Sequence, residues 1–475
     1  MEQKAQKTLS QKHELFSETP VPKALMTLAV PTVISQLVTM VYNLADTFFV
    51  GKSNDPVKVA AVSVCFPLLF LMNAFSNLFG IGGGSLVARL LGQKRDSDAR
   101  KVAVFSLYGS IFLGIIYVLL IAVFREPILA FLGASENTSA HCQDYVFYVI
   151  LLGSIPTITG LTVSHLLRNE GFSTIASIGL TGGGILNIIL DPLFMFVILP
   201  AGQEVKGAAI ATLISNCAAL LFFVVILLFQ KEKSILSLNP RVGIPEKEQI
   251  KSIFLVGLPS AIASGLANLA NMFMTHLSAS YGDITLAATG IVKKIDMLPM
   301  NTGMGLCQGM IPLVAYNYAS GNYKRMRQVI RTARTWGLIF AGICILCFET
   351  LAPSIVRFFI LDPDTVRLGS RFLRIAVLTT PLTIVVFQTN YSFQAIGCGT
   401  YSLIISVCKQ GILYIPLLYL ANYLFQMDGV MGVQIAADIL TLLIAFLLWR
   451  YKVEPMLRQK ELKQKSEYSH KTRQQ

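Results

Sequence analysis

Charged side chains are scarce in this sequence. Asp, Glu, Lys and Arg make up 14% of its residues, against about 25% in soluble domains. Apolar residues contribute 54%, and the mean hydropathy is +0.62. Segments of about 20 apolar residues, the length needed to cross a bilayer, recur along all 475 residues. The composition excludes a soluble globular protein and predicts an all-α polytopic membrane protein.

The signatures of several other classes are also missing. The glycine clusters "GIGGGSLVARLLG" and "TGGGILN" lack the GK[ST] ending of a phosphate-binding loop, so we expect no ATP-driven transport. The five histidines are scattered and no HExxH motif occurs, so we expect no enzyme and no cofactor. The eight cysteines form neither a disulfide framework nor a metal-binding array. The first twenty residues are too polar and acidic for a cleavable signal peptide.

The chain does contain about twelve apolar segments. The most polar stretch between them is 231–251, near the midpoint. We therefore predict an amino-terminal lobe at 1–235 and a carboxy-terminal lobe at 236–475, with six spans each. The predicted spans are 24–50, 58–80, 102–124, 146–167, 175–199, 207–229, 252–280, 285–312, 332–356, 372–396, 403–424 and 430–449.

Lys and Arg are distributed unequally between the two sides of this topology. With the amino terminus inside, the inner segments hold 27 of them and the outer segments 8. This asymmetry follows the positive-inside rule and predicts a cell-membrane protein with both termini in the cytoplasm. It also explains the net charge of +13 without nucleic acid. The exception is 357–374, where four arginines lie outside: Arg357, Arg367, Arg371 and Arg374.

The two halves of the sequence resemble each other. Pro31 in "LAVPTVISQL" corresponds to Pro259 in "FLVGLPSAIA", and "GAAIATLIS" in the sixth span corresponds to "GVQIAADIL" in the twelfth. An even number of spans per half gives both halves the same orientation. The repeat therefore predicts two lobes related by a pseudo-twofold axis along the membrane normal, as in many secondary transporters.

Two carboxylates lie inside spans of the first half. A charge there costs about 2.5–3.5 kcal/mol on insertion scales. Asp191 in "NIILDPLF" lies roughly 12 Å below the outer end of its span, and Asp46 roughly 7 Å. Asn187 is at i−4 from Asp191, on the same helical face. Pro192 has no N–H, which frees the carbonyl of Ile188. Such oxygens suit a monovalent cation, while burial and mutual repulsion equally favour a proton. The alternative is that each carboxylate only bonds to a neighbouring helix.

The second half contains other charged residues. Lys293 and Asp296 are at i and i+3, which favours a structural ion pair between them. Glu349 lies near the outer end of its span, where it can reach the headgroups. Asp438 has no local partner.

Amide, aromatic and methionine side chains occupy the seventh and tenth spans. Such a surface suits flat lipophilic cations, although plain packing is an alternative for each residue. The candidate residues for the substrate path are Asn268, Asn271, Met274, Gln388, Tyr391 and Gln394.

The order of these motifs resembles the multidrug and toxin extrusion (MATE) family over nearly the whole chain. The resemblance rests on "YNLADTFFVG", "GGGSLVARLLGQKR", "LLRNEGF", "NIILDPLF", "GAAIATLIS" and "GLCQGMIPLVAYNYASGN". The last of these is most similar to the MepA-like branch.

The resemblance implies two six-helix lobes that alternate between outward-open and inward-open states. It implies export of cationic amphiphilic drugs or metabolites against inward H+ or Na+ flow. Asp46, Asn187 and Asp191 match the family's cation site, with possible Na+ binding, and Thr212 matches its hydroxyl ligand. Ser164 stands in place of a further Asn. NorM-type members carry acids in the seventh and tenth spans, where this chain has only amides, so coupling should depend on the amino-terminal lobe.

Two rival functions remain. The first is a flippase of lipid-linked oligosaccharide or a related lipid in the same broad superfamily, and the second is a channel. Flippases usually have additional spans or a cavity rich in basic residues, which these spans lack. We also expect a monomer that contacts membrane lipid.

Overall fold

A computed structural model describes residues 13–52, 55–229 and 234–474. Within these ranges the chain is helical and contains no strand. The first half comprises α2 (Val21–Gly51), α3 (Pro56–Gly92), α4 (Asp96–Phe131), α5 (Glu136–Tyr145), the π-turn η1 (Val146–Leu152), α6 (Ser154–Asn169), α7 (Ser173–Leu193), the π-turn η2 (Phe194–Ile198) and α8 (Glu204–Phe229).

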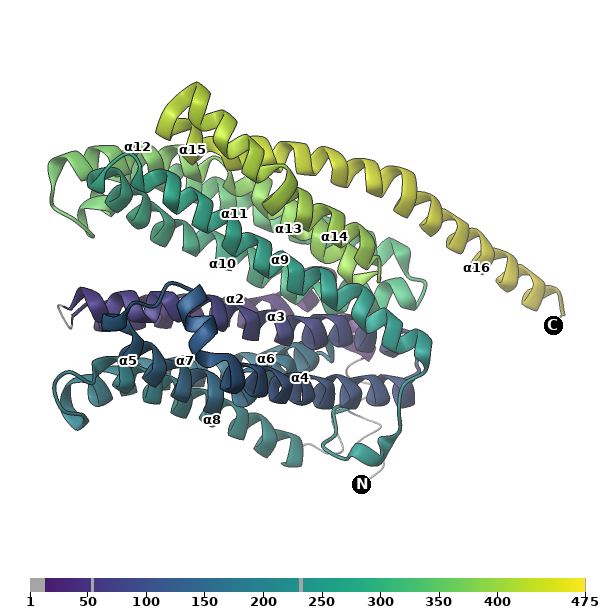
Figure 1. The fold of residues 1–475 in the computed structure, drawn as a ribbon. Helices are drawn as coiled ribbons and strands as arrows, with labels where there is room; N and C mark the ends of the chain where they lie inside the picture. Colours follow the sequence, from purple (N-terminus) through teal and green to yellow (C-terminus); the bar gives the residue numbers. More distant parts are fainter. Residues whose placement is uncertain (1–12, 53–54, 230–233, 475) are drawn as a thin grey trace. The chain divides into compact units, whose positions relative to one another are not determined.

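The second half follows a short 3-10 turn, η3 (Pro240–Val242). It comprises α9 (Lys247–Ala279), α10 (Asp283–Ala319), α11 (Tyr323–Arg357), α12 (Pro363–Val377), α13 (Thr380–Ala395), α14 (Gly399–Val407), the π-turn η4 (Cys408–Ile412), α15 (Tyr414–Leu448), the π-turn η5 (Trp449–Val453) and α16 (Glu454–Gln474). Figure 1 shows these helices along the chain.

The helices confirm the predicted spans. Among the described residues, eight helices are long and apolar enough to cross a membrane, and two bent pairs raise the number to ten. The pairs are α5–η1 with α6, bent by 48°, and α12 with α13, bent by 42°. The predicted span 285–312 lies in α10, and α15 breaks at Gln426, where φ is +52°. That break separates the predicted spans 403–424 and 430–449, so each of the twelve agrees with a helix or bent pair.

The chain forms two compact units. One contains Val30–Val87 and Asp96–Gly265, and the other contains Ala88–Arg95, Leu266–Gln475 and the described part of Gln11–Ala29. The division at residues 235 and 236 stays a prediction.

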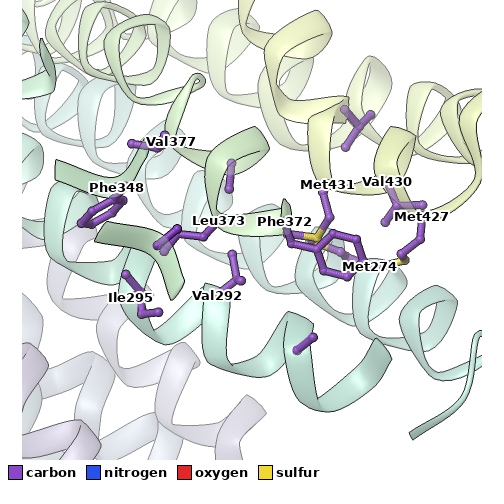
Figure 2. Close-up of a cluster of buried hydrophobic side chains, with 14 of the residues drawn as sticks. Met274, Val292, Ile295, Phe348, Phe372, Leu373, Val377, Met427, Val430 and Met431 are labelled. Carbon is purple, nitrogen blue, oxygen red and sulfur yellow. The ribbon is translucent and has the colours of Figure 1, made fainter. Parts of the chain in front are cut away.

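Apolar side chains fill the interior of each unit and also cover its outside. In the second unit a buried cluster includes Met274, Val292, Phe348 and Phe372 (Figure 2). On α4, by contrast, several large apolar side chains are exposed, and Val123 is 72% exposed. Soluble proteins avoid large continuous apolar surfaces, whereas lipid solvates them, so this pattern is typical of a membrane protein.

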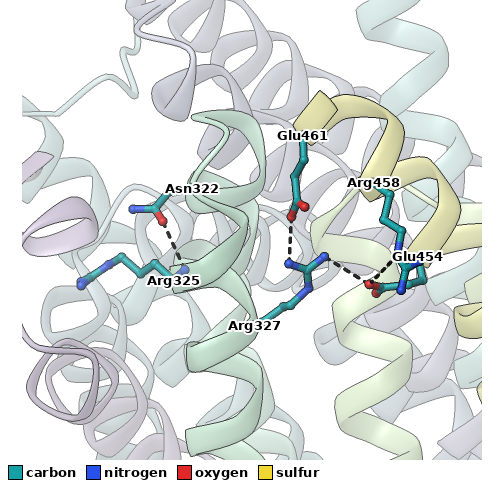
Figure 3. Close-up of polar contacts among 6 residues, drawn as sticks. All are labelled: Asn322, Arg325, Arg327, Glu454, Arg458 and Glu461. Carbon is teal, nitrogen blue, oxygen red and sulfur yellow. Dashed lines mark hydrogen bonds and ion pairs between the residues drawn. The ribbon is translucent and has the colours of Figure 1, made fainter. Parts of the chain in front are cut away.

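The basic carboxy-terminal helix α16 is attached to the start of α11 by ion pairs. Arg327 bonds to Glu461 at 2.8 Å and to Glu454 at 3.3 Å (Figure 3). Asn322 caps α11 by accepting a hydrogen bond from the backbone N–H of Arg325 at 3.2 Å. These contacts hold the basic tail against the second unit, at the side that the charge asymmetry assigns to the cytoplasm.

Three of the four arginines that the topology places outside form ion pairs with acidic residues. Glu349 forms an ion pair with Arg374, and its expected reach to the headgroups stays a prediction. The pairs are Arg367 with Asp364 at 3.4 Å, Arg371 with Asp428, and Arg374 with Glu349 at 3.7 Å.

Candidate functional site

Asp191 is fully buried in α7, with 0% of its surface exposed. Its Oδ1 accepts a hydrogen bond from the Asn187 Nδ2 at 3.2 Å. This is the i−4 pair that the sequence predicted. Its Oδ2 is equally buried and has no hydrogen-bond partner among the described residues. Leaving a buried carboxylate oxygen without a hydrogen bond costs free energy. A proton or a bound cation on this oxygen would remove that cost.

Asn187 connects this carboxylate to α8. The same Nδ2 donates a hydrogen bond to the Thr212 Oγ1 at 3.4 Å, while the Asn187 Oδ1 has no partner in the described part of the chain. The structure therefore brings Asn187, Asp191 and Thr212 together, with two buried oxygens left available. Carboxylate, amide and hydroxyl oxygens are the ligands that hard cations prefer.

Glycines explain how α7 approaches its neighbours so closely. A Cβ on Gly183 would lie 3.1 Å from the Ala219 side chain of α8, and one on Gly184 would lie 3.2 Å from the Tyr42 ring of α2. The "TGGG" cluster thus permits close helix packing. After Pro192 the helix continues as the π-turn η2. π-turns inside α-helices often occur at functional sites.

Asp46 lies on α2, near Asp191. The two carboxylates interact electrostatically, and Tyr42 interacts with both. The Asp46 Oδ1 is buried without a hydrogen-bond partner among the described residues. Tyr145, at the end of α5, is also buried and interacts with both carboxylates.

The sequence analysis missed both tyrosines. Tyr42 was detectable because it lies at i−4 from Asp46, on the same helical face. Tyr145 was not detectable, because its segment reads as a polar outer loop.

Ser164 is buried in α6, but no hydrogen bond joins it to Asn187 or Asp191, and its hydroxyl has no partner in the described part of the chain. A different link between α6 and α8 was missed. Asn216 donates from its Nδ2 to the Thr157 Oγ1 at 2.9 Å. Asn216 is one helical turn beyond Thr212, a spacing that the sequence contained.

The charge balance of this site is unusual. None of the ion pairs in the described parts of the chain includes Asp46 or Asp191. These parts also contain no group of three or more His, Cys, Asp or Glu that could hold a metal ion. A buried carboxylate and a partly buried one, neither with a basic partner among the described residues, favour either protonation or a bound monovalent cation.

The predicted pair between Lys293 and Asp296 is wrong. Lys293 donates instead to the Thr275 Oγ1 of α9 at 3.0 Å, and no ion pair joins it to Asp296 within the described residues. The i, i+3 spacing permits a contact, but a neighbouring helix offers Lys293 a better one.

The expectation that Asp438 has no local partner is wrong, because the Gln434 Nε2, one helical turn earlier on α15, donates to the Asp438 Oδ1 at 2.8 Å. A basic partner comes from another segment. The Lys409 Nζ lies 2.9 Å from the Asp438 Oδ1, and both side chains are buried. The two residues come from η4 and α15.

The candidate substrate-path residues are separated into different environments. Met274 belongs to the buried apolar cluster (Figure 2). Gln388 accepts from the Arg334 Nε at 2.9 Å, and Gln394 donates to the Ser402 hydroxyl at 3.0 Å. Asn271 is exposed and donates to the backbone carbonyl of Ala267 at 3.0 Å. Asn268 and Tyr391 are partly exposed. The role of these six residues stays a prediction.

Comparison with known proteins identifies the family. A model of the family described as MatE matches residues 31–193 and 259–420, once in each half. The chain belongs to the MATE family. This confirms the predicted family and the predicted fold class, a transporter of twelve spans in two lobes, and it confirms a multi-pass membrane transporter rather than an enzyme.

Individual MATE proteins match nearly the whole chain. The multidrug export protein MepA of Staphylococcus aureus (strain MSSA476) is 33% identical over 434 residues, which cover 91% of this chain and 94% of that protein. MepA of Staphylococcus haemolyticus (strain JCSC1435) is 31% identical over 435 residues, with the same coverage. A crystal structure of MATE in the straight conformation superposes with a TM-score of 0.87 at 25% identity and covers 94% of this chain and 99% of that one.

Proposed function

We propose that this MATE transporter exports small cationic amphiphilic compounds in exchange for H+ or Na+. Two observations support the proposal. The relatives that match over nearly the whole chain are named multidrug export proteins, which favours drug export over lipid flipping. The Asp191 carboxylate is fully buried without a basic partner, which a channel or a flippase would not require.

The proposed mechanism couples the charge of the site to alternating access. An ionised carboxylate in a closed apolar interior is penalised by several kcal/mol, so the conformation that encloses Asp191 is favoured when a cation is bound. Cations that enter from outside neutralise Asp191 and Asp46, one positive charge for each ionised carboxylate, and shift the equilibrium toward that conformation. Their release inside restores the other one. A complete switch between two states requires about a 10⁴-fold difference in cation affinity.

The substrate would bind apart from the cation. The amides Asn268 and Asn271, with the aromatic and methionine side chains on the same span, offer polar and polarisable contacts to a flat lipophilic cation. We place both termini in the cytoplasm, where the inner basic segments follow the positive-inside rule. Export is then directed toward the side of the paired arginines on α12.

The first experiment measures efflux of a fluorescent lipophilic cation from proteoliposomes. An imposed pH gradient or an imposed Na+ gradient drives wild type, Asp191→Asn and Asp46→Asn. The matched control is Asp364→Asn, which removes the same charge from an exposed carboxylate, 68% accessible at its side chain. We expect gradient-driven efflux by wild type and the control, and a loss of more than tenfold in both site variants.

The outcome also identifies the ion and tests the rivals. Efflux under only one gradient names the coupling ion. Unchanged efflux by well-folded Asp191→Asn would refute coupling through this carboxylate. Passive, unsaturable conductance in a planar bilayer would establish a channel. Absence of drug flux under either gradient, with movement of a lipid-linked sugar, would establish a flippase.

A further inference from the structure

The two halves of the chain carry corresponding polar positions. "NLAD", residues 43–46, aligns with "NLAN", residues 268–271, so Asn271 replaces the carboxylate of Asp46. "GAAIATL", residues 207–213, aligns with "GVQIAAD", residues 432–438. Asp438 therefore lies one residue beyond the position that corresponds to Thr212. The amino-terminal cluster lies on α7 and α8, the fifth and sixth spans, and the corresponding spans of the second half are the eleventh and twelfth.

A second buried polar cluster joins those two spans to α13 of the tenth span. The Lys409 Nζ of η4 lies 2.9 Å from the Asp438 Oδ1 of α15, with the two side chains 4% and 0% exposed. The Gln434 Nε2 donates to the same oxygen at 2.8 Å. The Thr383 hydroxyl of α13 donates to the Asp438 Oδ2. The ammonium of Lys409, the amide of Gln434 and the hydroxyl of Thr383 thus surround one carboxylate, that of Asp438.

The two clusters differ in how their carboxylates are satisfied. The Asp191 Oδ2 has no hydrogen-bond partner among the described residues, whereas both oxygens of Asp438 are bonded. The Lys409 Nζ also lies 4.6 Å from the centre of the Phe387 ring, within reach of a cation–π contact. Lys409 thus gives Asp438 a basic partner, whereas none of the ion pairs in the described parts of the chain includes Asp191.

We infer that the ammonium of Lys409 is a resident cation in the carboxy-terminal counterpart of the cation site, and that it keeps this lobe from binding a coupling ion. The inference rests on the proposed coupling function of Asp191. It gives Lys409 a specific role: the transporter takes up exchangeable cations through one lobe only. Removing Lys409 should convert Asp438 into a second acceptor of H+ or Na+.

The surroundings of the pair favour this role. Tyr414 interacts electrostatically with Asp438, and Asp296 of α10 interacts with Lys409. Neither supplies a second positive charge. Loss of one partner from a buried ion pair leaves an uncompensated charge that is strongly destabilising. Without Lys409, the Asp438 carboxylate can be neutralised by a proton or by a free cation in place of the ammonium.

Thermal unfolding of the purified full-length protein in detergent tests the inference without measuring transport. All variants carry Asp46→Asn/Asp191→Asn as a common background, which removes both carboxylates of the first site. The midpoint of this background alone gives the baseline response to Na+ and pH. With Lys409→Met added, the midpoint should rise by at least about 3 °C more than this baseline with added Na+ or with falling pH, because a ligand that binds the folded state stabilises it. Adding Asp438→Asn should abolish the rise.

Each result decides. No response beyond the baseline when Lys409→Met is added to the Asp46→Asn/Asp191→Asn background would overturn the inference, as would a response that persists after Asp438→Asn. Lys409→Arg, which keeps the charge, should show no new response. If the proposed function fails instead, wild type shows no gradient-driven efflux, and these unfolding results are unaffected.

A second measurement distinguishes a resident cation from a moving part. Lys409→Met/Asp438→Asn, in an otherwise wild-type chain, replaces the charged pair by a neutral one. We expect gradient-driven efflux within tenfold of wild type. A larger loss in a protein that unfolds at the wild-type temperature would show that the pair takes part in the transport cycle and would overturn the inference.

Discussion

The glycine cluster on α7 allows a sharp test of how the cation site is assembled. Gly182, Gly183 and Gly184 follow one another, yet their surroundings differ. A Cβ on Gly182 meets no atom within 4 Å, whereas one on Gly184 lies 3.2 Å from Tyr42 and 3.3 Å from Val38 of α2. These distances are shorter than the about 3.5–4.0 Å of an ordinary carbon contact. Gly184→Ala therefore requires the Tyr42 and Val38 side chains of α2 to move away from α7 by a few tenths of an ångström, and Gly182→Ala does not.

The magnitude follows from two opposing terms. Replacing a helical glycine by alanine stabilises by about 1 kcal/mol at either position. Overpacking costs about 1–3 kcal/mol, at Gly184 alone. Gly182→Ala should thus be neutral or stabilising, and Gly184→Ala should be less stable than it by about 1–3 kcal/mol. Because Tyr42 lies one helical turn before Asp46, a shift of α2 that accompanies this movement separates Asp46 from Asp191. We expect a roughly tenfold loss of gradient-driven efflux if about 1.4 kcal/mol of cation binding is lost.

Thermal unfolding and proteoliposome efflux of the two variants provide the comparison. Both substitutions add one methyl group to the same helix, so general effects on insertion or expression cancel. Equal stability and equal efflux of Gly182→Ala and Gly184→Ala would refute the reasoning that Gly184 sets the distance between α2 and α7.

Three further predictions concern single contacts. Thr212→Ala removes the hydroxyl that accepts a hydrogen bond from Asn187. It should weaken the apparent affinity for the coupling ion about fivefold, which corresponds to one hydrogen bond of about 1 kcal/mol, whereas Thr212→Ser should not. Efflux measured against ion concentration gives this affinity. Gly257→Ala places a Cβ against the backbone of α3, while Gly265 on the same helix has no atom within 4 Å of that position, so only Gly257→Ala should lower the unfolding midpoint. Thr365 donates to Asp362 and lowers the pKa of that carboxyl. The cap of α12 is therefore present above the usual Asp pKa of about 3.9 and is lost as the pH falls through the lower folded pKa. Hydrogen exchange in the first turn of α12 should accelerate at that pH, and in Asp362→Ala it should be fast at any pH.

Span positions were predictable because lipid imposes a length and a composition on each helix. The contact between Asn187 and Asp191 was predictable as well, because an i, i+4 pair on one helix needs no knowledge of packing. Thr212 came from the family resemblance, and the structure places it within reach of Asn187. The roles of these residues in coupling stay predictions.

Contacts between helices were not predictable in the same way. Lys409 and Asp438 are far apart in sequence, and only the packing of η4 against α15 brings them to 2.9 Å. For Lys293 a local partner was expected, but its ammonium instead donates a hydrogen bond to Thr275 of the adjacent helix. Local spacing decides a contact only where no neighbouring helix offers a closer group, and in a membrane interior most polar groups find such neighbours.

The irregular helix turns occur where the polar clusters are. η2 begins three residues after Asp191, and η4 contains Lys409. A π-turn lets one residue bulge and leaves backbone groups less tightly bonded than in a regular α-helix. The backbone of η2 also lies against α8, where a Cβ on Gly207 would approach Met195 to 2.9 Å. A shift of η2 on cation binding would therefore be transmitted directly to α8 and to Thr212. At η4 the ammonium is covalently part of the chain, so the same kind of turn holds a fixed charge.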